Sequence, residues 1–540
     1  MITLPLLMVF IPIVTAIIIY MLERKWGNYL VFVAQGLMSY VFLRLILMFP
    51  EINEQRYVLG NWTLQSGIAL KIDNLSLAFI GLSIFLWWLV LLYAWEFHGD
   101  DNKFLFFLLF LEGTFMGLLM VNDLFSLFVF IDIITILSSI LVVYKKDGWS
   151  LRSGLYYLMI NSMGMLTYVM GFLIVYLLTG TLNWDLATHR LALLGHTPPV
   201  YAAYILMSAS VLVKAAVFPT FNWLSRAHGS APASISTLLS GLLVKAGLYG
   251  FIRIQELFSE QLLGDFFFYL GFITALTGII FAISQKDIKQ ILAFHTISQV
   301  GIILIGISQI QTDLYYGGLI HLFNHAMFKS LLFMGAGVII NHYKTRRLTE
   351  IRGVLKRFPL IAIAMIIGVL SITGTPFFNG YLGKYIIAYE LQNRPFFGML
   401  FQLINLGTLI SFAKFSQIFF PDTKESLSFT PHLSTLTLTR KERFNLPIFI
   451  LAFMCIFITF GYNTLGDLLQ AEFPSVNLYS TSKMIQWSLL AALAIALTKI
   501  FIFSDRITPL LHRIREIKIP FYNTAYMFIL FLATMLLFAH

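Results

Sequence analysis

The sequence is poor in charge and contains only one cysteine. Charged residues make up 11% of its 540 positions and hydrophobic residues 59%, whereas a soluble domain averages about 25% charged residues. A chain with so few charges cannot cover a surface exposed to water, and apolar stretches recur from one end to the other. The composition therefore predicts an integral membrane protein whose main solvent is the lipid bilayer.

The single cysteine, Cys455, lies within an apolar run. One thiol excludes disulfide frameworks, cysteine-based zinc sites and iron–sulfur ligation. No glycine-rich loop follows a strand pattern, so the sequence offers no nucleotide site either. We therefore expect this chain to bind no metal and no cofactor. Its net charge of +10 is expected to face anionic lipid rather than nucleic acid.

Apolar segments of membrane-spanning length occur along the whole chain. A transmembrane helix needs about 20 apolar residues, and about sixteen segments of this kind are present. They lie at 3–21, 29–49, 74–96, 104–121, 123–144, 154–179, 201–223, 234–255, 265–284, 290–308, 314–341, 359–390, 397–418, 446–462, 485–504 and 522–539. The predicted fold is thus an all-α, polytopic transmembrane bundle of about sixteen spans.

Two segments exceed one span and contain helix breakers. Pro219 lies in the seventh segment, and Gly374-Thr375-Pro376 lies in the twelfth. Proline removes a backbone donor and clashes with the preceding turn. A simple kink is the commoner explanation of any single proline. Two broken helices, each with a lysine close by, instead favour transporter architecture, in which protein or a wet cavity satisfies the freed backbone groups.

Lysine and arginine are distributed unevenly between the connecting loops. Most of them lie in loops that follow odd-numbered segments, which the positive-inside rule places in the cytoplasm. Both termini are then expected on the non-cytoplasmic side of a bacterial or archaeal cytoplasmic membrane. A polar, basic stretch at 419–445 separates the last three segments from the rest, and the pattern at 505–520 predicts an amphipathic helix on the cytoplasmic surface.

The most informative residues are ionisable groups inside apolar segments. Each costs about 2.5–3.5 kcal/mol at a helix centre on the insertion scale, so such residues are rare and usually functional. The candidates for proton or ion translocation are Asp132, Lys214, Lys245, His321, His325, Lys329 and Lys384. Secondary candidates, each of which also fits a structural hydrogen bond or a snorkelling side chain, are Glu112, His228, His295 and Lys414.

The candidate set is predicted to work as a row of proton relay stations. His321, His325 and Lys329 follow one another at i, i+4 and i+8, which places them on one face of a helix. Histidine titrates near neutral pH. Burial disfavours the charged form of a lysine and a nearby carboxylate favours it, so a change in their distance lets a lysine take up or release a proton.

Several ordered motifs within residues 70–420 resemble one family of membrane subunits. These are Asp123-Leu-Phe-Ser-Leu-Phe-Val-Phe-Ile-Asp132, Lys214 with Pro219, Trp223-Leu224, Ala227-His228 and Ala231-Pro232, Lys245-Ala-Gly-Leu-Tyr-Gly, Asp287 to Gly301, His321-Leu-Phe-Asn-His325-Ala-Met-Phe-Lys329, and Gly374 to Lys384. The chain resembles the antiporter-like subunits of respiratory complex I. The same family includes the D-type subunits of multi-subunit cation/proton antiporters and the related membrane-bound hydrogenase subunits.

The resemblance implies a fourteen-helix core with two inverted five-helix repeats, in which helices seven and twelve are broken. It implies two proton half-channels joined by a polar axis at mid-membrane. The corresponding division of the chain is an N-terminal three-helix segment at 1–100, a first repeat at 101–260, a second repeat at 261–420, and a basic loop with C-terminal spans at 421–540.

The resemblance also implies roles for individual residues. Asp132 and Lys214 would form the carboxylate–lysine switch of the first repeat. Lys245 would be the central relay, His321 and His325 the bridge into the second repeat, and Lys384 the exit station. Asp132 stands where the family usually has glutamate, so its contact with Lys214 is expected to need a water or a helix shift.

The function implied by the resemblance is proton translocation by one membrane subunit of a larger complex, such as an NADH:quinone oxidoreductase, a hydrogenase or a cation/proton antiporter. Redox centres would reside in partner subunits. One alternative is a sodium or other cation pathway on the same scaffold. Another is a membrane partner of a soluble enzyme, such as an inorganic-carbon accumulating complex.

Overall fold

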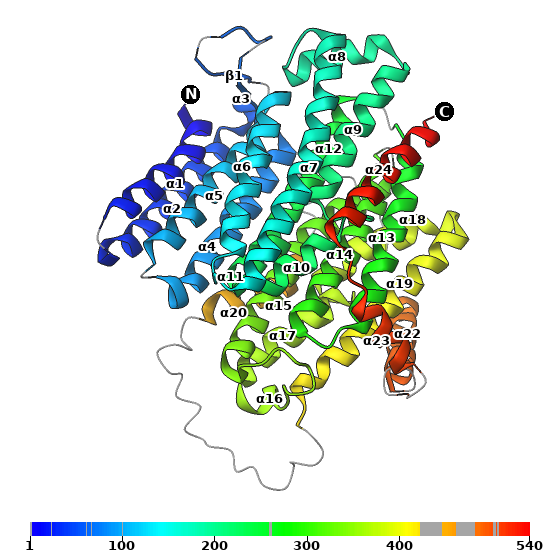
Figure 1. Ribbon diagram of the computed structural model, residues 1–540. Helices are drawn as coiled ribbons and strands as arrows, with labels where there is room; N and C mark the ends of the chain where they lie inside the picture. Colours follow the sequence, from blue (N-terminus) through cyan, green and yellow to red (C-terminus); the bar gives the residue numbers. More distant parts are fainter. Residues whose placement is uncertain are drawn as a thin grey trace.

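The computed structural model describes residues 3–539 except 422–444, 461–480 and the short stretches 23, 54, 61, 66, 100, 259–261, 311, 500–503 and 505–506. The described chain is a bundle of α-helices (Figure 1). Its helices are α1 (Thr3–Met21), α2 (Arg24–Leu47), α3 (Phe49–Ile52), α4 (Asn74–His98), α5 (Asn102–Met120), α6 (Leu124–Val142), α7 (Gly148–Thr179), α8 (Trp184–Leu194), α9 (Pro198–Lys214), α10 (Asn222–Ser230), α11 (Ala233–Leu238), α12 (Val244–Leu257), α13 (Gly264–Ser284), α14 (Ile288–Ile307), α15 (Asp313–Tyr343), α16 (Val354–Arg357), α17 (Pro359–Ile372), α18 (Asn379–Glu390), α19 (Pro395–Phe415), α20 (Leu446–Phe460), α22 (Thr481–Leu497), α23 (Thr508–Glu516) and α24 (Phe521–Phe538). Two short antiparallel strands, β1 (Tyr57–Val58) and β2 (Ala69–Leu70), pair near the start of α4.

Twelve helical stretches of the described chain are long and apolar enough to cross a membrane. Four shorter apolar helices, α9, α17, α20 and α22, occupy the other predicted segments. The predicted all-α, polytopic bundle is therefore confirmed. Both termini lie at the end of the bundle that carries β1 and α8, whereas α16 lies at the opposite end (Figure 1).

Aspartates set the start of several membrane-spanning helices. The carboxylates of Asp73, Asp101, Asp123, Asp147 and Asp287 each accept a hydrogen bond from a backbone N–H in the first turn of α4, α5, α6, α7 and α14. An N-terminal cap of this kind stabilises a helix by about 1 kcal/mol, and a negative charge there also complements the helix dipole. The first aspartate of the fifth-segment motif is thus a capping residue.

Both predicted helix breaks are confirmed. Helix α9 ends at Lys214, and α10 resumes at Asn222 after a turn that contains a cis peptide bond before Pro219. Helix α17 ends at Ile372, and α18 resumes at Asn379. Each break therefore frees backbone groups at the helix ends from regular helical hydrogen bonds, so that other groups can pair with them.

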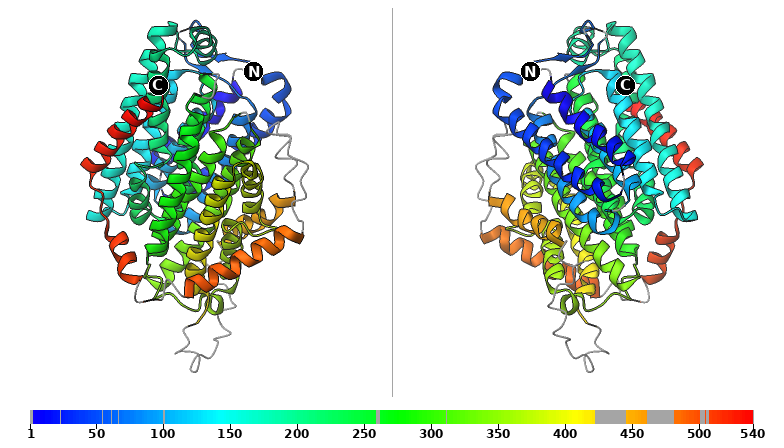
Figure 2. Two further views of the ribbon diagram at one scale, coloured as in Figure 1. Left: turned by 90° about the vertical axis from the view of Figure 1, so that its right-hand side faces the viewer. Right: turned by 90° about the vertical axis from the view of Figure 1, so that its left-hand side faces the viewer.

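The first and last helices lie on the outside of the bundle. The side views show α1 and α2 on one flank and α24 running at a slant along another (Figure 2). The amphipathic segment predicted at 505–520 forms α23, which has no buried residue. The basic stretch predicted at 419–445 falls almost entirely outside the described residues.

Candidate functional site

The buried titratable residues are concentrated on α9, α12, α14, α15 and α18. The side chains of Lys214, Lys245, His321, His325, Lys329 and Lys384 are all buried, as are those of the secondary candidates Glu112, His228, His295 and Lys414. Asp132 is half-buried on α6. Charged groups this deep require partners, and the partners show how the set is arranged.

Lys214 ends α9 and binds two hydroxyl groups. Its Nζ donates to Thr135 Oγ1 and to Tyr157 OH, both at 2.7 Å. The ammonium also lies 5.0 Å from the centre of the Tyr157 ring, within the range of a cation–π interaction. The break after α9 leaves this lysine at the last turn of a helix, where the dipole favours a positive charge.

Asp132 lies one helical turn before Thr135 on α6, and Thr135 accepts a hydrogen bond from Lys214. The two charges interact electrostatically, but Lys214 donates its hydrogen bonds to Thr135 and Tyr157 rather than to the carboxylate. Sequence reasoning singled out neither Thr135 nor Tyr157.

Lys245 forms the centre of the arrangement. Its Nζ lies 2.6 Å from His325 Nδ1 on α15, and it also donates to the backbone carbonyl of Ser240. Ser240 belongs to a π-helical turn, Leu239–Leu243, that directly precedes α12. Such turns are rare and often occur at functional sites.

The three titratable residues of α15 contact α12 and α14. His321 Nε2 lies 3.0 Å from Gln299 Oε1, and Lys329 Nζ donates to Leu292 O at 2.7 Å. The His321 and His325 rings are 6.5 Å apart. The structure therefore brings Lys245 and both histidines into one buried cluster where α12, α14 and α15 meet.

Lys384 follows the second break and binds a carbonyl that the break exposes. Its Nζ donates to Ile372 O, in the last turn of α17, at 2.8 Å. Gly383 places its helix against His321, because a Cβ there would lie 2.7 Å from His321 Cβ. Lys384 and the central cluster thus lie on helices in direct backbone contact.

The secondary candidates are separate from these contacts. Glu112 accepts a hydrogen bond from Gln35 Nε2 at 2.6 Å, and the His228 and His295 rings lie against Phe333 and Phe412. Lys414 donates to Ile283 O and Gln285 O at the end of α13. The contacts of Glu112 and Lys414 fit structural roles, whereas both ring nitrogens of His228 and of His295 are buried without a hydrogen-bond partner among the described residues.

Lys289 is a buried lysine that sequence reasoning missed. It lies in the first turn of α14, and its Nζ donates to Ala231 O at 2.7 Å, at the end of α10. It also lines a cavity of about 460 Å³ with Asp101, Lys145 and Arg346, at the end opposite the termini. The motif from Asp287 to Gly301 contained the residue, but Lys289 lies just outside the predicted segment at 290–308 and so was not among the ionisable groups inside apolar segments.

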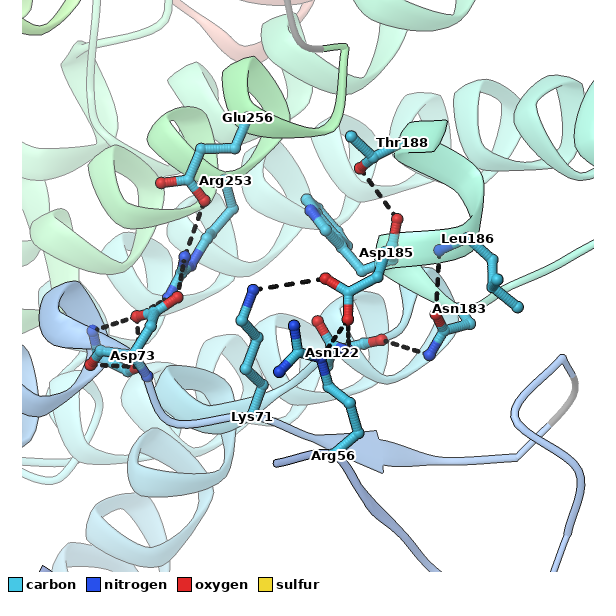
Figure 3. A network of polar contacts seen from close by, with 12 residues as sticks. Arg56, Lys71, Asp73, Asn122, Asn183, Asp185, Leu186, Thr188, Arg253 and Glu256 are labelled. Carbon is cyan, nitrogen blue, oxygen red and sulfur yellow. Dashed lines mark hydrogen bonds and ion pairs between the residues drawn. The ribbon is translucent and has the colours of Figure 1, made fainter. Parts of the chain in front are cut away.

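A second polar cavity, of about 380 Å³, opens at the end that carries the termini. Figure 3 shows the network of polar contacts to which its lining residues Lys71, Asp73, Asp185 and Arg253 belong. Arg253, two turns beyond Lys245 on α12, pairs with Asp73 at 2.7 Å. Asp185 pairs with Lys71 at 3.4 Å and also with Arg56. Burial alone would raise the pKa of both aspartates, but the neighbouring cations and hydrogen bonds outweigh it and lower the pKa of each.

Loss of the Arg253–Asp73 pair is expected to destabilise the fold. Arg253→Gln leaves a largely buried carboxylate without its cation, which costs about 3 kcal/mol. Because the pKa of Asp73 is lowered in the folded state, the pair stabilises the protein above the unfolded-state pKa, and this contribution fades as pH falls. Thermal unfolding in detergent measures the effect. The control is Arg347→Gln, whose pair with Glu350 is exposed. Equal unfolding temperatures for the two variants would contradict the expectation.

The sequence and the fold of this chain are similar to those of known membrane subunits. The profile described as NADH:quinone oxidoreductase/Mrp antiporter, transmembrane, matches residues 121–411. A putative antiporter subunit mnhA2 of Staphylococcus epidermidis is 31% identical, over 82% of this chain and 59% of its own length. Hydrogenase-4 component B of Escherichia coli is 32% identical, over 59% of this chain and 50% of its own length. The chain thus spans about half the length of these two relatives.

Another relative is matched over more of its length. The D-type Na(+)/H(+) antiporter subunit of Alkalihalophilus pseudofirmus is 31% identical, over 66% of this chain and 74% of its own length. Two solved structures share the fold. A chain of the archaeal membrane-bound sulfane sulfur reductase has a TM-score of 0.76 at 23% identity, over 90% of this chain and 99% of its own. A chain of the Mrp complex from Dietzia sp. DQ12-45-1b has a TM-score of 0.74 at 20% identity, over 95% and 99%.

Proposed function

The chain belongs to the NADH:quinone oxidoreductase/Mrp antiporter membrane family, and from this premise we propose that it is a proton-translocating membrane subunit of a multi-subunit complex. Its partners are other membrane subunits, as the names of its relatives, antiporter subunits and a hydrogenase component, suggest. These names favour an energy-coupling complex over a membrane partner of a carbon-accumulating enzyme. Any redox chemistry belongs to those partners.

One observation carries the proposal: the buried ionisable candidates on α9, α12, α15 and α18 are amines and imidazoles. Lys245 and His325 are in hydrogen-bond contact, and the helix of Lys384 packs directly against that of His321. An ammonium has donors and no acceptor, so it cannot coordinate a metal cation. Amines and imidazoles do bind and release protons, which makes the proton the transported species that this lining favours.

Each station has a role in the proposed route. The negative charge of Asp132 holds Lys214 protonated. Thr135, one turn from Asp132 on the same helix, couples the two residues through its hydrogen bond with Lys214. Lys245 receives the proton at the π-helical turn, where His325 accepts it. His321 passes it toward Lys384, whose release completes the transfer. Lys329 lies one turn further along α15 and tunes the central cluster through its charge.

Sodium is the rival ion, because one relative is named a Na(+)/H(+) antiporter component. The purified complex in sealed vesicles, driven by a membrane potential in choline medium, distinguishes the two. Proton movement followed by a pH-sensitive dye is expected to proceed without sodium. Movement only after sodium is added would contradict the proposal and favour a sodium pathway.

The orientation is also part of the proposal, with both termini on the non-cytoplasmic side of a bacterial or archaeal membrane. The native Cys455 is buried, and a Cys455→Ser background removes it altogether. Single cysteines introduced at 342–358 in this background then show on which side of the membrane the loop lies. They are expected to react with an impermeant maleimide only from the cytoplasmic side. Cysteines introduced near β1 are expected to react only from the other side. The reverse pattern would overturn the orientation.

A further inference from the structure

A cavity of about 520 Å³ lies beside Lys384, between α18, α19 and α22. Its wall includes Lys384 and Tyr385 of α18, Asn405 of α19, and Lys483 and Gln486 of α22. Helix α22 lies beyond residues 121–411, which the family profile matches. One side of the cavity at the proposed exit station is therefore built by a C-terminal helix that carries none of the sequence motifs.

Among the described residues, the charged side chains in the wall of this largely apolar cavity are all lysines. Two lysines line it together with amide and phenol groups, and within the described part of the chain the lining includes no aspartate or glutamate. Lys483 Nζ lies 5.9 Å from the centre of the Tyr385 ring. Since Lys384 is the next residue, the second lysine faces the same turn of α18 as the proposed relay residue.

We infer that Lys483 is a specificity-determining residue that keeps sodium and other metal cations away from Lys384. This inference rests on the proposed function and adds that sodium is excluded at the cavity beside Lys384. A metal cation keeps its full charge in the cavity, where a nearby ammonium repels it in a medium less polarisable than water. Channels use rings of lysine or arginine in the same way, and acidic rings where cations pass.

A proton escapes this repulsion because it does not travel as a free cation. It binds to the amine of Lys384 and moves between neighbouring hydroxyl and amide groups by exchange. Tyr385, Asn405 and Gln486 supply such groups around the cavity. Without Lys483, the same oxygen atoms would be ligands for sodium, since hard cations bind carbonyl and hydroxyl oxygen. The ammonium of Lys483 therefore excludes sodium from a cavity that would otherwise admit both sodium and protons.

The test is sodium inhibition of proton flux in the purified complex in vesicles, with choline chloride at equal ionic strength as the reference. Lys483→Glu is expected to lower the sodium concentration that halves proton flux at least tenfold, because the carboxylate attracts sodium into the cavity. The half-inhibiting sodium concentration of Lys483→Gln is expected to lie between those of Lys483→Glu and wild type. That of Lys483→Arg is expected to match wild type. The matched control is Lys499→Glu, an exposed lysine just beyond the other end of α22.

The outcomes separate this inference from the proposed function. Sodium-independent proton flux in wild type, with identical sodium responses in Lys483→Glu and Lys499→Glu, would overturn the inference and leave the proposed function standing. Absence of sodium-independent flux in wild type would overturn both. Lys483 is a partly exposed residue near the start of α22, so all three variants are expected to assemble, and the amount of assembled complex is measured for each of them.

Discussion

Asp132→Asn is expected to reduce proton flux about tenfold or more, whereas Asp132→Glu retains most of it. An opposite charge near a buried amine changes its proton affinity by about tenfold or more, and asparagine removes that charge with almost no change of shape. Glutamate keeps the charge on a longer side chain and leaves the hydrogen bond of Lys214 to Thr135 in place. Flux is measured in vesicles at equal amounts of assembled complex.

A purely structural role for Asp132 reverses this order. Asparagine preserves a hydrogen bond and would be mild, while glutamate adds a methylene to a packed site and would be harmful. An active asparagine variant beside an inactive glutamate variant would therefore exclude the switch. Thr135→Val is the companion variant, since it removes the hydroxyl that Lys214 binds and leaves both charges in place. The switch predicts reduced flux for it as well.

The sequence was sufficient to predict the helices and the breaks. Apolar runs of spanning length correspond to helices because the bilayer leaves backbone groups no other partner. Pro219 and Pro376 marked the two interruptions, since proline cannot continue the backbone ladder. Both breaks lie next to a buried lysine, as their spacing in the sequence predicted.

The partners of the buried lysines could not be predicted in the same way. Lys384, Lys289 and Lys414 donate to backbone carbonyls at the ends of α17, α10 and α13. A carbonyl has no residue-specific signature, and which helix end meets which lysine depends on how distant helices cross. The two hydroxyl groups that Lys214 binds could not be predicted either, because they come from different helices. Only the spacing of Thr135, one helical turn from Asp132, is evident in the sequence. The cavity wall formed by α22 joins residues about 100 positions apart in the chain, and no local pattern indicates such contacts.

Substitution of Lys384, the proposed exit station, is expected to have the second large effect on proton flux. Lys384→Met replaces a buried amine by an apolar side chain of similar length. It leaves Ile372 O without its donor, which costs about 1–3 kcal/mol, but it also removes a buried charge, so the fold and its assembly are expected to survive. No other lysine of α17 or α18 in the described chain can substitute for it. Proton flux is therefore expected to fall to the level of empty vesicles.

The most direct measurement is thus potential-driven proton flux in sodium-free vesicles for wild type, Lys384→Met and the exposed control Lys499→Met, at equal amounts of assembled complex. A buried relay predicts wild-type flux in Lys499→Met and no flux above leak in Lys384→Met. Wild-type flux in an assembled Lys384→Met complex would contradict it, because protons would then be crossing without the residue at which the proposed route ends.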